Sequence, residues 1–171
     1  KRTEAYIVNL DDGRIKRRGF FRLTDRTRPN DPLPDSYKYG IAAYELDKLL
    51  DLNIVPSSVE REMNGRKGSL TIYIEGALKE SDRRRKKIEP PDPQAFENAL
   101  EEIKIFEYLA YSFSLCGQRD LGDILIMDKE DWKVWTVDFS EAFAPYSELM
   151  PGCSITRCSK KLYQNLVPKS I

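Results

Sequence analysis

The segment that most constrains the fold of this chain is residues 117–140, which read as a polar loop, a β-strand, a turn and a second β-strand. Apolar residues at 124–126 and the aromatic and β-branched residues at 132–137 predict the strands, and polar residues at 128–131 predict the turn. Because antiparallel strands joined by a short turn return the chain to its starting end, we expect Asp138 to lie beside the loop that precedes the first strand.

Two further antiparallel hairpins are expected in the first half of the chain. Each combines strand-forming residues with a turn that contains Gly. The predicted strands are residues 5–10, 15–23, 59–63 and 69–75, and the predicted turns are residues 11–13 and 64–68. Residues 25–34 include three Pro and predict a loop.

Helical periodicity appears in three segments. Apolar residues recur at three- and four-residue steps between Ser36 and Leu50, and either Asp35 or Ser36 is able to cap the start. The same spacing predicts a long helix over residues 93–115, and a short helix is expected at 159–167. Together the helices and strands predict an α+β protein of one domain or two small lobes.

A polar segment separates the two halves of the chain. It contains the basic run 83–87 and a Pro-rich stretch at 90–93, which makes it a natural seam between lobes. We therefore expect an N-terminal lobe at residues 1–78 and a C-terminal lobe at residues 79–171. The basic run is expected to be a solvated face or a helix end, and the alternative is a contact with phosphate or a partner.

Composition excludes several classes of function. Lys plus Arg and Asp plus Glu number 28 each, so the balanced charge gives no reason to expect nucleic acid binding. No apolar run approaches the roughly 20 residues of a membrane span. The absence of His excludes catalysis by a His base and a His-ligated metal site. Three Cys, at positions 116, 153 and 158, indicate free thiols in a reducing compartment, so we expect a cytoplasmic protein.

The order of these elements and the amino-acid sequences of two segments resemble a known superfamily. Residues 41–56 run from a helix through Asp47 into Val55 and Pro56, and they are similar to type II phosphatidylinositol 4-kinases and secretory-pathway casein kinases, in which an A-x-Y/F-x-x-D helix leads to V-P. Residues 137–143 look similar to uncharacterised bacterial members of that superfamily. The resemblance implies a small bilobal protein-kinase-like fold. Its N-lobe would be an antiparallel sheet with one helix, and its reduced, mainly helical C-lobe would carry a β-hairpin.

The resemblance also implies where ATP and a divalent cation, Mg²⁺ or Mn²⁺, would bind. Arg22 stands where the family has the Lys that holds nucleotide phosphates, and Glu75, the last residue of its strand, is the second expected contact of the cofactor. Gly40 stands where the family has the Glu that pairs with that Lys. Asp123, in place of the usual Asn, and Asp138 are the expected metal ligands, because hard cations prefer carboxylate oxygen.

The catalytic loop departs furthest from the family pattern D-R-x-x-G-N. Gln118 occupies the position of the catalytic Asp, where it is able to orient a hydroxyl or a water but not to accept a proton as a carboxylate does. In a competing register, Arg119 and Asp120 resemble the R-D of ordinary protein kinases, and Asp120 is then the base. A structural alternative treats Asp120, Asp123 and Asp138 as turn-forming acids at strand ends.

Two hypotheses of function follow. The first is a pseudokinase that binds a divalent metal, a nucleotide or both between its lobes and acts through a protein partner. It is favoured by simultaneous change at the positions of Arg22, Gly40, Gln118 and Asp123. The second is an active ATP-dependent phosphotransferase, with Asp120 as base and with the expected metal ligands in their usual role.

Overall fold

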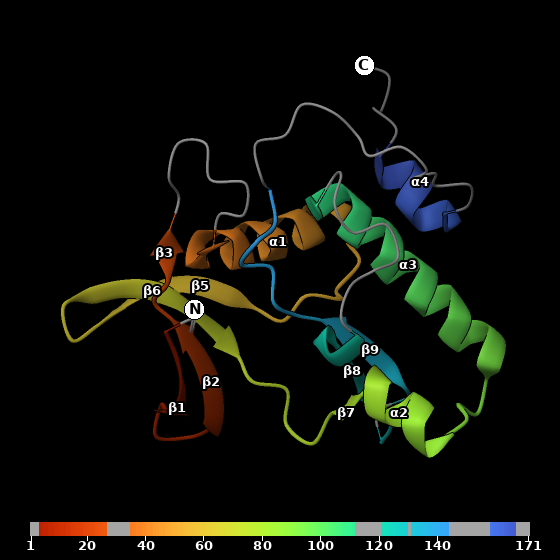
Figure 1. Cartoon of the computed structure of the whole chain (residues 1–171), viewed down its shortest axis with the longest axis horizontal. Coiled ribbons are helices and arrows are strands. Elements are labelled where there is room, and N and C mark those ends of the chain that lie inside the picture. Colours follow the sequence, from red (N-terminus) through yellow and green to blue (C-terminus); the bar gives the residue numbers. More distant parts are fainter. Residues whose placement is uncertain (1–3, 27–34, 112–120, 130, 144–157, 167–171) are drawn as a thin grey trace.

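The computed structural model describes residues 4–26, 35–111, 121–129, 131–143 and 158–166, and it confirms the α+β fold class (Figure 1). The described part contains a four-stranded antiparallel sheet, a three-stranded antiparallel sheet, a two-stranded pair and four α-helices. In Figure 1 the four-stranded sheet lies on one side of the molecule, and the three-stranded sheet lies on the other side with α2 and α3.

The four-stranded sheet consists of two hairpins side by side, in the order β1-β2-β6-β5. Its strands are β1 (Ala5–Asp11), β2 (Lys16–Arg22), β5 (Ser58–Met63) and β6 (Arg66–Ile72). In the first turn, Oδ1 of Asp12 accepts hydrogen bonds from the backbone N–H groups of Arg14 at 2.9 Å and Ile15 at 2.7 Å. This local bonding closes the hairpin that the sequence predicts.

The second turn is shorter than expected. Only Asn64 and Gly65 lie between the strands, with φ of 53° and 73°, so the predicted turn at 64–68 is wrong in its length. Positive φ at both central residues is typical of the two-residue hairpin turn that matches the twist of the strands. Gly68 belongs instead to β6, where a Cβ would lie 2.3 Å from the carbonyl oxygen of Arg22. The Gly is therefore required by the close approach of β2.

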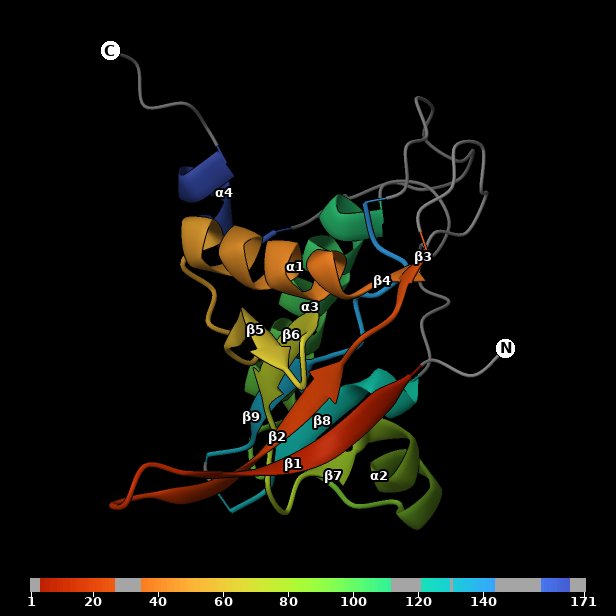
Figure 2. The ribbon, with the colours of Figure 1, turned by 90° about the vertical axis from the view of Figure 1, so that its left-hand side faces the viewer.

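Helix α1 (Tyr37–Leu50) packs against β5 and β6 (Figure 2). Oγ of Ser36 accepts a hydrogen bond from the backbone N–H of Lys38 at 3.2 Å, which confirms Ser36 as the N-cap. Just before the helix, β3 (Asp25–Arg26) pairs with β4 (Asp35–Ser36), although a loop was predicted there. The rest of that predicted loop, residues 27–34, lies outside the described residues.

The three-stranded sheet is built around the predicted hairpin. Its strands are β7 (Leu78–Lys79), β8 (Ile124–Met127) and β9 (Lys133–Thr136), and the 3-10 helix η1 (Leu121–Asp123) precedes β8. The hairpin of β8 and β9 is confirmed, whereas β7 was not predicted. The chain leaves the first sheet at Ile72 and joins the second at Leu78, so the expected boundary after residue 78 falls inside β7.

The basic run forms most of helix α2 (Glu80–Lys86), which the sequence did not predict. Glu80 is fully buried, and its carboxylate receives hydrogen bonds from Nε of Arg83 and Nε of Arg84, both at 2.6 Å. Burial alone raises the pKa of a carboxyl group, but these two bonds hold the pKa of Glu80 below its usual value. Two members of the run therefore neutralise a buried acid, and the run ends a helix as expected.

The hydrophobic core lies between α1, α3 (Pro93–Tyr111), the β8–β9 hairpin and α4 (Lys160–Leu166). Ile103, Phe106 and Ala110 of α3 are at most 1% exposed, which confirms that the predicted helical stripe faces the core. Leu162 of α4 is also fully buried in this cluster. The core thus joins the first helix to the second half of the chain.

Two expectations from composition concern the chain as a whole. Among the described residues, every helix falls short of the length and apolar character that a membrane crossing requires. Cys158 is an exposed free thiol, and the other two Cys lie outside the described residues.

Candidate functional site

A cavity of about 390 Å³ lies between the two larger sheets. This volume is within the range of small-molecule sites. Its apolar wall includes Phe20, Val55, Ile72, Ile74, Ala77 and Leu125. In the described part of the chain, four charged residues also line it, namely Arg22 from β2, Lys79 from β7, Asp123 from η1 and Asp138 beyond β9. Residues from distant parts of the sequence therefore meet around one space that has an apolar wall and charged groups.

Arg22 ends β2 and shares the cavity face of that strand with Phe20, because alternate strand residues point the same way. Its Nη2 donates a hydrogen bond to Oδ1 of Asp138 at 2.8 Å, and its Nη1 lies 3.6 Å from Oδ1 of Asp35. The side chain of Arg22 is only 12% exposed. Its positive charge is therefore balanced by two carboxylates within the protein.

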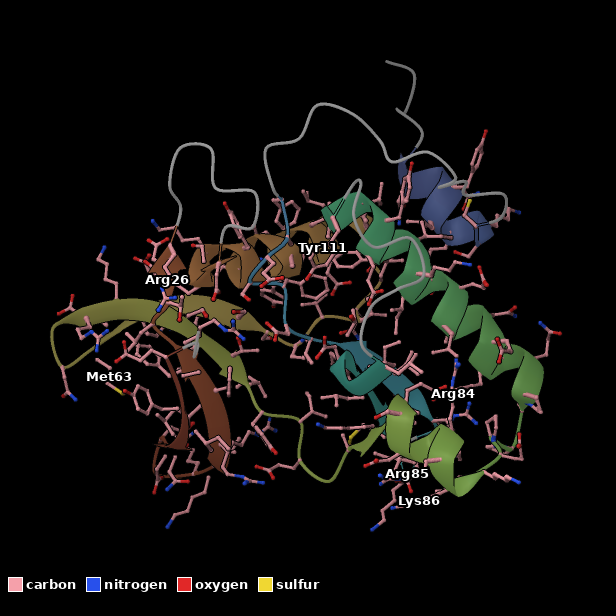
Figure 3. All side chains as sticks on the ribbon, viewed as in Figure 1. Arg26, Met63, Arg84, Arg85, Lys86 and Tyr111 are labelled. Carbon is pink, nitrogen blue, oxygen red and sulfur yellow. The ribbon has the colours of Figure 1, made fainter. Side chains whose placement is uncertain are left out.

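Asp138 is held at its backbone by helix α3. The hydroxyl of Tyr111 donates to the carbonyl oxygen of Asp138 at 2.9 Å, and the ring of Tyr111, labelled in Figure 3, stacks on Phe139. Asp138 has φ of 63°, in the left-handed region that Asp tolerates better than most residues. Oγ of Ser140 donates to Oδ1 of Asp138 at 3.2 Å. These contacts fix the carboxylate beside Arg22.

Asp123 reaches the cavity from the same end of the hairpin, just before β8 begins. Its carbonyl oxygen accepts a hydrogen bond from the backbone N–H of Val137 at 3.0 Å. The register pairs Ile124 with Thr136, so the residues just outside the hairpin, Asp123 and Asp138, lie on the same side of the sheet end. The expectation that the hairpin returns Asp138 to the preceding loop is confirmed for the described part of that loop.

Asp47 explains why the helix of residues 41–50 leads so regularly into Val55 and Pro56. It is 2% exposed, and its Oδ2 accepts hydrogen bonds from the backbone N–H groups of Ile54 and Val55, both at 3.2 Å. Burial raises the pKa of Asp47, although these bonds oppose the shift. Val55 and Pro56 line the cavity, whereas Asp47 lies behind them. Asp47 therefore supports the cavity wall without being part of its surface.

Gly40 lies in α1 on the cavity wall, and a Cβ placed there meets nothing within 4 Å. The position where the resemblance expects a Glu therefore presents open space. Arg22 pairs instead with Asp35, which precedes the helix. The ion pair that the resemblance implies cannot form at Gly40, and the described partner of Arg22 near the helix is Asp35.

The surroundings of Arg22 are acidic. Partial burial raises the pKa of Glu141, and the nearby carboxylates of Asp35 and Asp138 raise it further, although Arg22 lowers it. An acidic site of this kind favours a cation, because a positive charge relieves repulsion between carboxylates.

The cavity offers a divalent cation only part of its coordination shell from the described residues. Within the described ranges, no group of three or more acidic or Cys side chains is arranged to hold an ion. Asp123 and Asp138 supply two carboxylates on one cavity wall. Two protein carboxylates are sufficient for Mg²⁺, which usually keeps several waters and takes further oxygen ligands from substrate phosphates. The residues therefore fit a cation that arrives with a nucleotide.

Not every predicted site residue joins this cavity. The structure brings Arg22, Asp123 and Asp138 together. Glu75 lies outside the cavity lining, because its carboxylate pairs with Arg18, whose Nε donates to Oε1 at 2.7 Å, and this bond lowers the pKa of Glu75. The expected contact between Glu75 and the cofactor is therefore not supported by its position. The two candidates for the base, Gln118 and Asp120, lie outside the described residues.

Two residues of the site were missed by sequence reasoning. Lys79 lines the cavity from β7, a strand of two residues whose only signal is its pairing with β8. Asp35 was considered only as a helix cap, and its pairing with Arg22 depends on the approach of β2 to the start of α1. Neither role has a local pattern that reveals it.

Comparison with known proteins adds no relative: no model of a protein family matches this sequence, and no curated protein matches it. The function must therefore be argued from the cavity and its residues.

Proposed function

We propose that this chain is a kinase-like domain with a degenerate catalytic site, a pseudokinase that binds an adenine nucleotide with a divalent cation in the cavity between its two sheets. The observation that carries the proposal is the meeting of Arg22, Asp123 and Asp138 on one cavity. These residues come from three separate segments, and each was expected there as a contact for phosphate or metal.

The character of the cavity supports a nucleotide. Its apolar wall suits a planar base, and the carboxylates of Asp123 and Asp138 would hold Mg²⁺ or Mn²⁺. The bound cation would neutralise phosphate charge beside these acids. A cytoplasmic location and action through a protein partner belong to the same proposal.

Three features favour binding without catalysis. Arg22 is already paired with Asp138 and Asp35, and Gly40 offers no carboxylate to draw it into the arrangement of the family. Gln118, at the position of the expected base, has no group that accepts a proton as a carboxylate does. The residues of the cavity are therefore better suited to binding a nucleotide than to catalysing the proton transfer of a kinase reaction.

The test is a transfer assay. Purified chain mixed with ATP, Mg²⁺ or Mn²⁺ and generic protein and lipid acceptors is expected to transfer no phosphate above the enzyme-free blank. Turnover that is abolished by Asp138→Ala would contradict the pseudokinase.

The second candidate is an active phosphotransferase, favoured by the presence of both expected metal carboxylates on the cavity. In that case Asp120→Asn should lower turnover strongly and leave nucleotide affinity nearly unchanged, because positioning and charge neutralisation do not depend on the base. Unchanged turnover would remove Asp120 from the mechanism.

A further inference from the structure

Among the described residues, two cationic side chains line the cavity, and they come from different sheets. Arg22 belongs to β2 of the four-stranded sheet, and Lys79 belongs to β7 of the three-stranded sheet. A nucleotide bound between the sheets carries several negative charges. Arg22 and Lys79 differ in whether an ion pair within the protein already holds the side chain away from such a ligand.

Arg22 already forms ion pairs within the protein. Its guanidinium bridges Asp138 at 2.8 Å and Asp35 at 3.6 Å, and its side chain is 12% exposed. If Arg22 turned to a phosphate, the cation proposed at Asp123 and Asp138 would still neutralise Asp138, but Asp35 would lose this counter-ion. The side chains of Arg22 and Asp35 are 12% and 20% exposed, and separating a pair that is buried to this extent is strongly unfavourable. Arg22 is therefore expected to stay with its carboxylates when a ligand binds.

Lys79 differs from Arg22 in its exposure and its ion pairing. It is exposed, and within the described part of the chain it forms no ion pair. The neighbouring acid, Glu80, is fully buried and bonded to Arg83 and Arg84, so it does not neutralise Lys79. Pairing with Leu125, itself a cavity residue, fixes the backbone of Lys79 beside the cavity. A Lys in this situation combines an anchored backbone with a flexible stem and three donors.

We propose that Lys79, rather than Arg22, binds the phosphate of the nucleotide in this cavity. Arg22 then serves to hold Asp138 in place, and Lys79 supplies the positive charge that the ligand meets. This inference rests on the proposed function and names the residue that distinguishes a nucleotide from its nucleoside.

The test compares affinities for Mg²⁺–ATP and for adenosine in the wild-type chain and three variants, by titration calorimetry. Lys79→Gln is expected to weaken Mg²⁺–ATP by about tenfold and to leave adenosine unchanged, because only the charged hydrogen bond is lost. Lys79→Arg, which keeps the charge, is expected to retain most of the affinity. Lys86→Gln is the matched control, because Lys86 ends α2 and points away from the molecule (Figure 3).

The outcomes separate this inference from the function on which it rests. If wild type binds Mg²⁺–ATP and Lys79→Gln behaves like Lys86→Gln, the inference is overturned and nucleotide binding stands. An equal loss of ATP and adenosine affinity in Lys79→Gln also overturns it, since the Lys would then act through the structure of the wall. Failure of the wild-type chain to bind ATP at all overturns both.

Discussion

At the scale of single residues, buried carboxylates shape the cavity by bonding to backbone groups. Asp47 shows this most clearly, because it satisfies the N–H groups of Ile54 and Val55 at the point where the chain leaves α1. Without an acceptor, these N–H groups would be buried and unsatisfied, which is costly. The residue that marks the family resemblance is thus a structural support of the cavity wall.

Asp47→Ala is expected to destabilise the protein by about 2–4 kcal/mol, because two buried N–H groups lose their acceptor. Asp47→Asn keeps an oxygen acceptor and should cost less. Because the pKa of Asp47 is raised in the folded state, wild type should lose stability relative to Asp47→Asn as pH rises from about 4 towards neutrality. Urea unfolding of the three proteins at acidic and neutral pH measures both effects. Equal stability of the two variants would contradict this role.

At the scale of secondary structure elements, the hairpins and long helices follow local patterns that are visible in the sequence. Alternation and turn residues predict β1 with β2 and β8 with β9, and the capped apolar stripe predicts α1. By contrast, α2 has no apolar periodicity, since it contains only polar and charged residues. It is stabilised by the burial of Glu80 with two Arg, which is a tertiary effect that no local pattern reveals.

Helix α2 provides a prediction about that buried acid. Glu80→Gln is expected to destabilise the protein by about 3–5 kcal/mol at neutral pH, because Arg83 loses its buried counter-ion. The pKa of Glu80 is lowered by folding, so its contribution is present above about pH 4.5 and is lost as pH falls through the folded-state pKa. The difference between wild type and variant should therefore shrink in acid.

The matched control is Asp82→Asn on the same helix, whose partner Arg85 is largely exposed. An exposed ion pair contributes about 0–1 kcal/mol, so this variant should change the free energy of unfolding little. Chemical denaturation at several pH values measures both variants, and similar losses in the two would refute the special role of Glu80.

The contact of β2 with β6 gives a second prediction at this scale. Gly68→Ala should destabilise the protein by about 1–3 kcal/mol, because a Cβ would lie 2.3 Å from the carbonyl oxygen of Arg22 and force the strands apart. Gly40→Ala should instead stabilise it by about 0.5–1 kcal/mol, because the added methyl enters open space within a helix. Denaturation curves of both variants measure the two signs. A neutral Gly68→Ala would mean that the strands are less tightly apposed than the structure shows.

In the molecule as a whole, polar contacts around the cavity connect the first half of the described chain to the segments that follow β8. Besides the pair of Arg22 with Asp138, the N–H of Ser36 donates to the carbonyl oxygen of Ser140 at 2.8 Å, and the N–H of Thr136 donates to that of Ile54 at 2.9 Å. A ligand in the cavity would touch both sheets and reinforce this connection. Binding should therefore be visible as stability of the whole chain.

The positions of the cavity residues could be predicted from the sequence only where those residues lie beside a strand or hairpin that a local pattern indicates. Asp123 and Asp138 flank a predicted hairpin, so their proximity could be expected, whereas the assignment of Arg22 to the same site came from the resemblance; all three line the cavity. Lys79 was missed because its place depends on β7 joining a strand more than forty residues later. Glu75 was misplaced because its strand ends early, at Ile72, and Arg18 then takes its carboxylate.

Binding of Mg²⁺ and ATP in the cavity is tested by melting curves for wild type and Asp138→Asn with Mg²⁺ alone, ATP alone and both together. Asn tolerates the left-handed backbone at this position, so the variant adds no backbone strain, and its loss of the pair with Arg22 is measured by its own Tm without ligand. A ligand at one hundred times its Kd adds about 2.7 kcal/mol of stability. For a chain of this size that corresponds to a rise in Tm of about 5–10 °C. We expect such a rise for wild type with Mg²⁺ and ATP together, larger than with either alone and strongly reduced in Asp138→Asn. An unchanged Tm under every condition, with cooperative unfolding intact, would contradict binding in the cavity.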